Sequence, residues 1–460
     1  MPSSARRHLP LLLLTAFTTL AVAMGPAPAS GQSGAEGGGG GDCPTNSVVI
    51  ADAQADPDLA GPVGVDVDDD GQVYVADRTT NTVYRFNPDG TQTLAIPAAN
   101  GDPDLIDPTD VAALDDGTMW VADDGTNRIH RFNASGTQID VIGPAEATPD
   151  FQKPEGIAVD GAGTRLWVTD PETGVVYRFD GAGNQTSSFA ETNGDPDPSV
   201  GIGMNAIALD PTGDVVLTDQ GVDHVYRFNA DGTQDRVIPP AAGDPDLLAP
   251  VGVAVGADRS IWVVDQNVDG VYRFGAGGTQ KFFIDGAING GLSFARRLAL
   301  GRQGDLWATD EVNDAVFRWC FRPDARISRG TGPFAGDEIV NTTGAGQTRR
   351  AALGPGGSVT FTVRIDNDGN AHDQVTIRGT GGNSRFRVRY AFGGQNVTTA
   401  VVNGTFRTPS IIPGRDRALT VVVDALPGSP SGASRTLSIR LTSFGASPRV
   451  DVVKAVVTRT

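Results

Sequence analysis

Short runs of alternating apolar and polar residues make up most of the chain, and turns rich in Gly, Asn and Asp separate them. Apolar residues spaced as on one face of a helix are hard to find. Glycine accounts for 60 of the 460 residues, which suits a protein with many tight turns. The pattern predicts an all-β protein, and a chain of this length predicts more than one domain.

One short motif, apolar-x-Asp after an aromatic or aliphatic residue, recurs six times. Successive copies are 46, 47, 49, 46 and 45 residues apart. The aspartates are Asp77, Asp123, Asp170, Asp219, Asp265 and Asp310. Eight residues after each comes an arginine, and these are Arg85, Arg131, Arg178, Arg227, Arg273 and Arg318. Each repeat predicts four short strands, a to d, and a period near 46 with four strands predicts a six-bladed β-propeller.

The sixth repeat lacks a fourth strand, because its pattern stops at Cys320-Phe321-Arg322-Pro323. Residues 45–50 align without gaps with residues 91–96, which form the fourth strand of the first repeat. We therefore expect an N-terminal strand to close the last blade of a propeller spanning residues 43–323. The alignment also sets Cys43 and Cys320 two positions apart in an intact blade, which a disulfide can span. Two unrelated buried thiols are the alternative.

The repeats resemble NHL repeats. The best matching copy runs Pro154-Glu155-Gly156-Ile157-Ala158-Val159-Asp160, followed by Trp167-Val168-Thr169-Asp170 and a strand that contains Arg and Phe. The resemblance covers about residues 46–321. It implies a closed ring of blades with loops on two faces, often used to bind proteins, RNA or small molecules.

The repeated aspartates and arginines favour a structural role over a ligand site. A ligand site breaks the symmetry of a propeller, whereas the packing between blades repeats in every copy. We expect each Asp to cap turn amides or to pair with an Arg between blades.

Acidic loops lead from strand d of one blade to strand a of the next. They are Asp56-Pro57-Asp58, Asp102-Pro103-Asp104, Asp195-Pro196-Asp197 and Asp244-Pro245-Asp246. We expect them to surround the mouth of the central channel. Paired carboxylates suit Ca²⁺, the one cofactor that the sequence suggests, but Asp-Pro-Asp is also ordinary turn chemistry, which we favour.

A second candidate site lies where the strands a begin. Asp110, Glu155 and Asn205 start three of these strands, with Arg296 and Arg297 beside them. Six-bladed lactonases hold a metal at this place with Glu, Asn and Asp, so the resemblance offers a metal-dependent lactonase as an alternative function. Related lyases use zinc held by several His, whereas this ring has His130 and His224 at different blade positions. No catalytic residue is assigned.

The N-terminus predicts export. Arg6 and Arg7 precede an apolar run from Leu9 to Met24, and small residues follow, so residues 1–29 are expected to be a signal peptide. The run is short for a bilayer span, which makes a retained transmembrane anchor the weaker alternative. Residues 30–42 form a Gly-rich linker. The expected location is secreted or at the cell surface.

Residues 324–460 lack the repeat and predict an antiparallel β-sandwich. The segment Thr360 to Asn370 resembles the Ig-like domains of bacterial surface proteins. Residues 325–460 carry 17 Lys and Arg against 8 Asp and Glu, whereas residues 43–324 carry 17 against 45. The basic sandwich suits contact with an anionic cell-wall polymer or with the acidic propeller, and a solvated basic surface is the bland alternative.

These features together favour binding over catalysis. A net charge of −19 argues against nucleic acid as a partner, and two cysteines exclude a Cys-based zinc site. The sequence predicts an exported or cell-surface scaffold that presents an acidic propeller face to a protein, glycan or small-molecule ligand. The alternative is a metal-dependent lactonase or lyase acting at the channel mouth. The oligomeric state is left open.

Overall fold

The computed structural model describes residues 48–190, 203–286, 291–301, 304–337, 339–445 and 449–460. Cys43, the expected signal peptide and linker, and the loop Asp195-Pro196-Asp197 lie outside the described residues.

Six four-stranded antiparallel sheets occur in the described residues, one for each repeat. The first three are β2 (Pro62–Val67), β3 (Val73–Asp77), β4 (Thr82–Phe86) and β5 (Gln92–Ile96); β6 (Pro108–Ala113), β7 (Met119–Asp123), β8 (Arg128–Phe132) and β9 (Gln138–Ile142); and β10 (Gly156–Val159), β11 (Arg165–Asp170), β12 (Val175–Asp180) and β13 (Gln185–Ala190). The next two are β14 (Met204–Leu209), β15 (Val215–Asp219), β16 (His224–Phe228) and β17 (Gln234–Ile238); and β18 (Pro250–Val255), β19 (Ile261–Asp265), β20 (Gly270–Phe274) and β21 (Gln280–Asp285).

The sixth sheet takes its strands from both ends of the repeat region. It contains β22 (Ala295–Leu300), β23 (Leu306–Asp310) and β24 (Ala315–Trp319), and its fourth strand is β1 (Val48–Ile50). β1 pairs antiparallel with β24, so that Val48 faces Phe317 and Ile50 faces Val316. The prediction that an N-terminal strand completes the last sheet is confirmed.

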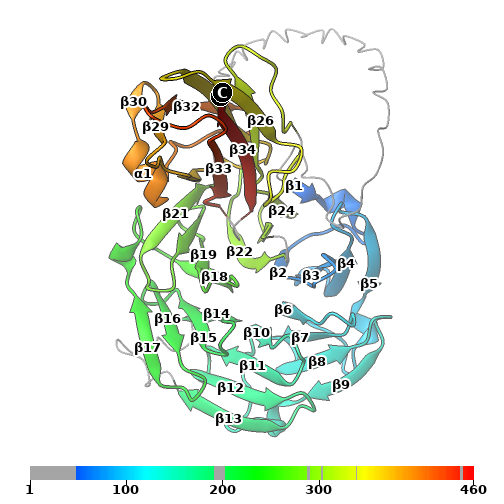
Figure 1. The fold of residues 1–460 in the computed structure, drawn as a ribbon. Coiled ribbons are helices and arrows are strands. Elements are labelled where there is room, and N and C mark those ends of the chain that lie inside the picture. Colours follow the sequence, from blue (N-terminus) through cyan, green and yellow to red (C-terminus); the bar gives the residue numbers. More distant parts are fainter. Residues whose placement is uncertain (1–47, 191–202, 287–290, 302–303, 338, 446–448) are drawn as a thin grey trace, which may run out of the picture. The chain divides into compact units, whose positions relative to one another are not determined.

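The first strands of the sheets pack against one another in a closed cycle. Each contacts the first strands before and after it, and β22 contacts β2. Figure 1 shows β6, β10 and β14 on the inner side of their sheets and β9, β13 and β17 on the outer side. The approach is close: a Cβ added to Gly64 would lie 2.7 Å from the Cα of Asp110. The arrangement confirms the β-propeller fold class.

Short 3-10 turns occupy several of the loops that lead into the first strands. They are Asp52–Gln54, Ala98–Asn100, Pro144–Glu146 and Pro240–Ala242.

The C-terminal region forms two five-stranded sheets. One has the order β25 (Pro323–Arg329), β27 (Ser358–Asn367), β32 (Asp416–Ala425), β29 (Phe386–Phe392) and β30 (Gln395–Asn396). The other has the order β26 (Thr348–Leu353), β34 (Val450–Arg459), β33 (Ser434–Ser443), β28 (Val375–Gly379) and β31 (Phe406–Arg407). A single-turn helix, α1 (Thr398–Asn403), completes the region.

Alternating side chains of these sheets meet in one core, as Phe361, Val363 and Ile365 of β27 illustrate. The sandwich is antiparallel except for one pair, because β26 runs parallel to β34. In the described part of the chain, no helix is long and apolar enough to cross a membrane.

Candidate functional site

The six repeat aspartates hold the turns of the blades in place. Asp77 is fully buried, and its Oδ2 accepts hydrogen bonds from the backbone N–H groups of Ala60 and Gly61, at 2.8 and 3.2 Å. Its Oδ1 accepts from Thr79 and Thr80, at 3.0 and 2.9 Å. One carboxylate therefore joins the loop that enters strand a to the turn that follows strand b.

The other five aspartates are also fully buried, and each has a turn amide bonded to its Oδ1. Asp123, Asp170, Asp265 and Asp310 also accept from the loop that precedes strand a. Their environment is that of buried turn caps.

The repeat arginines face the strand beside them. Four guanidinium carbons lie 4.9–5.3 Å from the ring centre of the Trp opposite them on strand b. The pairs are Arg131–Trp120, Arg178–Trp167, Arg273–Trp262 and Arg318–Trp307. Cation–π contacts of this kind stabilise the layer between blades.

Arg85 and Arg227 lack this Trp. Arg227 is paired instead with Asp210 at 2.5 Å and Asp214 at 2.8 Å. Arg85 donates to Thr93 Oγ1 at 3.1 Å. In all six blades, the arginine therefore serves packing between strands or turns.

The three described acidic loops, at Asp56, Asp102 and Asp244, are bonded to the outer strands of their sheets, so the expectation that they surround the channel mouth is corrected for these three. Asp56 donates its N–H to Gln92 Oε1 at 2.6 Å, and Gln92 begins the outermost strand of the sheet. Gln138 holds Asp102 with two bonds: its Oε1 accepts from the N–H of Asp102 at 2.9 Å, and its Nε2 donates to the carbonyl oxygen of Asp102 at 3.1 Å. The repeated Gln, which the sequence analysis passed over, acts as a clamp for the loop.

Two histidines belong to the frame of the blades. His130 is fully buried, and its ring nitrogens bond to Thr126 at 3.3 Å and Gln138 at 2.9 Å. Burial lowers the pKa of His130 from its usual value, so the ring is neutral at pH 7. The ring of His224 stacks on Tyr226 of the same strand. Neither histidine lies among the channel-mouth residues.

Cys320 is buried, and its backbone N–H donates to Asn370 Oδ1 at 2.8 Å. The expected bond to Cys43 lies outside the described residues and stays a prediction.

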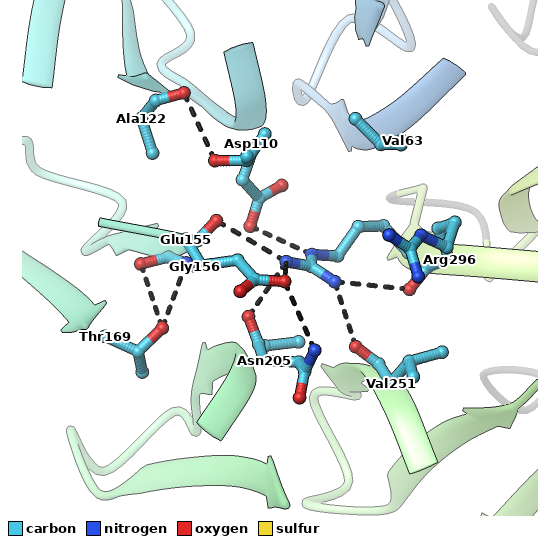
Figure 2. Close-up of polar contacts among 12 residues, drawn as sticks. Val63, Asp110, Ala122, Glu155, Gly156, Thr169, Asn205, Val251 and Arg296 are labelled. Atoms are coloured by element: carbon cyan, nitrogen blue, oxygen red, sulfur yellow. Dashed lines mark hydrogen bonds and ion pairs between the residues drawn. The ribbon is translucent and has the colours of Figure 1, made fainter. Parts of the chain in front are cut away.

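Four of the five channel-mouth candidates lie together at the centre of the ring, where Asp110, Glu155 and Asn205 surround the side chain of Arg297. Its side chain is 7% exposed. Its Nη2 donates to the carbonyl oxygen of Asn205 at 2.8 Å and to that of Glu155 at 3.4 Å. Its Nη1 donates to the carbonyl oxygen of Val251 at 3.0 Å. Figure 2 shows these carbonyl groups directed toward one point.

Carboxylates complete the surroundings of this guanidinium. Its Nε lies 3.4 Å from Asp110 Oδ2, and its Nη2 lies 3.8 Å from Glu155 Oε1. The side chain of Arg297 on β22 therefore contacts β6, β14 and β18, and also Glu155, the residue before β10. Burial raises the pKa of Asp110 to about 6, and the charge of Arg297 opposes the rise.

Glu155 and Asn205 are bonded to each other beside the guanidinium. Asn205 Nδ2 donates to Glu155 Oε1 at 3.2 Å, and Lys153 Nζ lies 3.9 Å from Glu155 Oε2. In the part of the chain that the structure describes, the buried Oδ1 of Asn205 has no hydrogen-bond partner.

Arg296 turns to a different set of partners. Its Nε lies 3.1 Å from Glu311 Oε2, and its Nη1 donates to Gln266 Oε1 at 3.3 Å. Burial lowers the pKa of Arg296 from its usual value, partly offset by Glu311.

These residues do not fit a resident metal ion. The Asp, Glu and carbonyl oxygens that would serve as ligands already surround the guanidinium of Arg297. A second cation there would meet a fixed positive charge within a few ångströms. No group of three or more His, Cys, Asp or Glu side chains that could hold a metal occurs among the described residues.

Asp66 is a channel residue that the sequence analysis missed. It lies on β2 and lines the same channel as Asp110 and Arg297. The signal was present, because the equivalent residue is Ala in the other five repeats: Ala112, Ala158, Ala208, Ala254 and Ala299. A single acidic residue in an otherwise uniform position is a departure from the repeat of the kind that marks a site.

One protein-family model matches part of the chain. Residues 59–86, which contain β2, β3 and β4, match the family model of the NHL repeat. No curated protein matches the chain.

Several solved structures are similar to the chain. Virginiamycin B lyase from Staphylococcus aureus is 21% identical with a TM-score of 0.40, covering 55% of this chain and 78% of that chain. A gluconolactonase from Xanthomonas campestris is 17% identical with a TM-score of 0.44, covering 59% and 87%. The WD40 repeats of RRP9 are 12% identical with a TM-score of 0.41, covering 56% and 94%.

Proposed function

We propose that this protein is an exported or cell-surface binding protein, in which the propeller holds the ligand and the C-terminal sandwich spaces or tethers it. One observation carries the choice of binding over catalysis. The guanidinium of Arg297 fills the channel mouth and is bonded to the carbonyl oxygens of Asn205 and Val251.

A metal-dependent lactonase or lyase needs something different at this place. Its cation must keep an open position for the substrate or for a water that it activates. Here the converging oxygens are occupied by the guanidinium of Arg297, which has only hydrogen-bond donors and offers no open coordination position. The arrangement supports a rigid ring that binds through its surfaces.

The face at the channel mouth offers paired charges and exposed apolar side chains. Arg78 Nη2 lies 2.9 Å from Asp107 Oδ2, and Arg296 Nε lies 3.1 Å from Glu311 Oε2. Ile106 is 52% exposed in the loop that leads into β6, and Val312 is 61% exposed just after β23. Such a mixture is typical of surfaces that bind proteins or glycans.

The rest of the proposal depends on the sequence. Arg6, Arg7 and the apolar run that follows support export, and the excess of Arg and Lys in residues 325–460 supports contact of the sandwich with an anionic polymer. An Ig-like identity of the sandwich and its division from the propeller at residue 324 belong to the same proposal.

A thermal-shift screen of the wild type and Arg297→Ala tests the choice between binding and catalysis. We expect that none of the three additives, Ca²⁺, Zn²⁺ and EDTA, changes the Tm of the wild type. Removing the guanidinium frees the oxygens of Asp110, Glu155 and the nearby carbonyls, so Ca²⁺ should raise the Tm of Arg297→Ala. Arg297→Lys, which keeps a positive charge, should not gain this dependence.

The same preparations are assayed with simple lactones. Metal-dependent lactone hydrolysis by the wild type, lost in Glu155→Gln while the Tm is kept, would replace the binding function by the catalytic alternative.

A further inference from the structure

Beyond the guanidinium of Arg297, the channel contains a cavity of about 190 Å³ lined by all six first strands. The lining begins at Asp110 and Arg297 and continues along the strands to Val159, Leu209 and Leu300. Glu155, the residue before β10, and Asn205, near the start of β14, are not part of it. The cavity therefore lies on the side of the a–b turns, and Arg297 closes its other end.

Apart from Asp66, Asp110 and Arg297, the side chains that line this cavity are those of Ala, Val, Ile and Leu, while those three charged residues and the backbone of the first strands add polar surface to its wall. At the level of Asp66, the other five strands present alanine methyl groups, and the neighbouring levels carry Val, Ile and Leu. Asp66 alone departs from the alanine ring. A carboxylate withdrawn from water is costly unless a partner compensates for the water that it has lost.

The partners of Asp66 within the chain are two backbone amides. Its Oδ1 accepts from Val67 N–H at 2.8 Å, and its Oδ2 accepts from Ala113 N–H at 2.8 Å. A carboxylate has about four acceptor positions, so two remain for a ligand in the cavity that Asp66 lines.

The charges in the channel are also unbalanced. Arg297 is paired with Asp110 at 3.4 Å, whereas no Lys or Arg among the described residues makes an ion pair with Asp66. An ionised Asp66 therefore leaves one negative charge in the channel without a counter-ion. Burial, reinforced by Asp110 and Asp68, raises the pKa of Asp66 to about 7, as expected for a carboxyl that lacks a cationic partner.

We propose that this cavity binds a primary ammonium group on an unbranched alkyl chain, with Asp66 as its ion-pair partner. The alkyl chain contacts the alanine and valine side chains, and the ammonium N–H groups donate to the carboxylate. A metal ion fits less well, because Ca²⁺ needs six or more oxygen ligands, whereas Asp66 and Asp110 are the two carboxylates of this lining and Asp110 is paired with Arg297. The inference goes beyond the proposed function, because this cavity lies on the side of the a–b turns and not on the face at the channel mouth.

The entrance to the cavity favours a cation. The a–b turns at that end carry exposed Asp69, Asp70, Asp115 and Asp116. Carboxylates around the opening of a low-dielectric channel raise the local concentration of positive ligands. The ammonium is carried either by a free alkylamine or by a lysine side chain of a partner protein.

Isothermal titration calorimetry of the full chain with two probes tests the proposal and separates these sources. The probes are n-butylammonium for a free amine and N-acetyl-lysine N-methylamide for a lysine side chain. Tetramethylammonium, which has charge but no N–H donor, is the control ligand and should not bind.

Asp66→Ala is the decisive variant, since it installs the residue that the other five blades already carry at this position. We expect it to weaken binding of the ammonium probe by about tenfold or more, because the ligand loses its charge-assisted acceptor. Asp70→Asn removes a charge from the same face but not from the cavity, so it should weaken binding by less than about twofold. Asp66→Asn, which keeps the size of the side chain, serves as the second variant.

Saturable binding of either probe that is lost in both Asp66 variants supports the inference, and the tighter probe identifies the source. Absence of binding to the wild type, or equal affinity in Asp66→Ala, would overturn it. Lactone hydrolysis by the wild type would instead refute the binding function, so the two failures are distinguishable.

Discussion

Two positions recur in every blade of the propeller. At one of them the residue is the same in all six repeats, and at the other it varies. The turn position carries Asp in all six repeats, and Asp77 and Asp265 make the same four bonds to backbone amides. The channel position varies along the chain as Gly64, Asp110, Gly156, Ala206, Gly252 and Arg297.

Geometry explains the difference. Every blade has its own entering loop and turn, and each leaves backbone N–H groups that need an acceptor, so the solution is repeated six times. The ring has one centre, and one guanidinium closes it at the channel mouth. A position that keeps the same residue in every repeat therefore has a structural role. A position whose residue varies around the channel is the place to look for function.

Removal of residues 43–50 is the most damaging way to break the repeated frame. It takes away β1 and leaves β24 with an open edge of unpaired N–H and C=O groups. We expect aggregation and no cooperative unfolding transition, measured by circular dichroism and light scattering.

The matched control keeps β1 and replaces Cys43 and Cys320 by Ser. It should fold, with a free energy of unfolding lower by about 2–5 kcal/mol, because only the expected cross-link is lost. Peptide mapping of the non-reduced wild type should find Cys43 joined to Cys320. Free thiols in protein from an oxidising compartment would contradict that pairing.

Asp77→Ala tests the turn position itself. Four backbone N–H groups lose a charged acceptor, so the free energy of unfolding should fall by about 3 kcal/mol in urea titrations. Ammonium affinity of the folded fraction should not change, since Asp77 is not part of the channel. A loss below about 1 kcal/mol would mean that water replaces the carboxylate as the acceptor.

Asp66 gives the channel positions a pH signature. The raised pKa of Asp66, about 7 against the usual 3.8, means that the folded chain holds a proton that the unfolded chain has released. Stability therefore falls as pH rises from about 4 to 7. Asp110 on β6, with its pKa raised to about 6, acts in the same direction, while Arg297 on β22 opposes its rise.

In Asp66→Asn this part of the decline should vanish, so the Tm difference between variant and wild type should grow from pH 5 to pH 8. A constant difference would show that Asp66 does not titrate in this range. Ammonium affinity of the wild type should increase over the same interval, as Asp66 ionises.

The smallest effect is expected for the Gln clamps. Gln92→Ala removes a two-way bond to Asp56 at the exposed outer strand, so the unfolding free energy should fall by about 0.5–1 kcal/mol. Hydrogen exchange should speed up in the loop of residues 51–61 and not in β2. Unchanged exchange in that loop would refute the clamp.

The frame could be predicted from the sequence because its signals are local and repeated. Asp, Arg and turn residues at a fixed period set the blades, and the alignment of residues 45–50 with 91–96 predicted the closing strand. The parallel pairing of β26 with β34 left no such signal, because a strand pair of this kind has no turn of its own.

The channel was harder to predict. The sequence brought Asp110, Glu155, Asn205 and Arg297 to one level, but it did not show that Arg297 points to the centre. The pairing of β22 with β23 is irregular between Ala295 and Leu298, and such a bulge changes which face a side chain occupies. The three described acidic loops were misplaced because they are long, and the spacing of residues alone does not tell which part of each loop crosses the blade.

The pairing of β1 with β24 joins residues about 270 positions apart, Val48 and Phe317. A chain synthesised from its N-terminus must therefore keep its first strand unpaired until its last blade exists. Any copy that stops short of Trp319 has two unpaired strands and no ring. Only a chain that reaches β24 can therefore pair its edge strands. An interrupted chain leaves these strand edges exposed to proteases and chaperones.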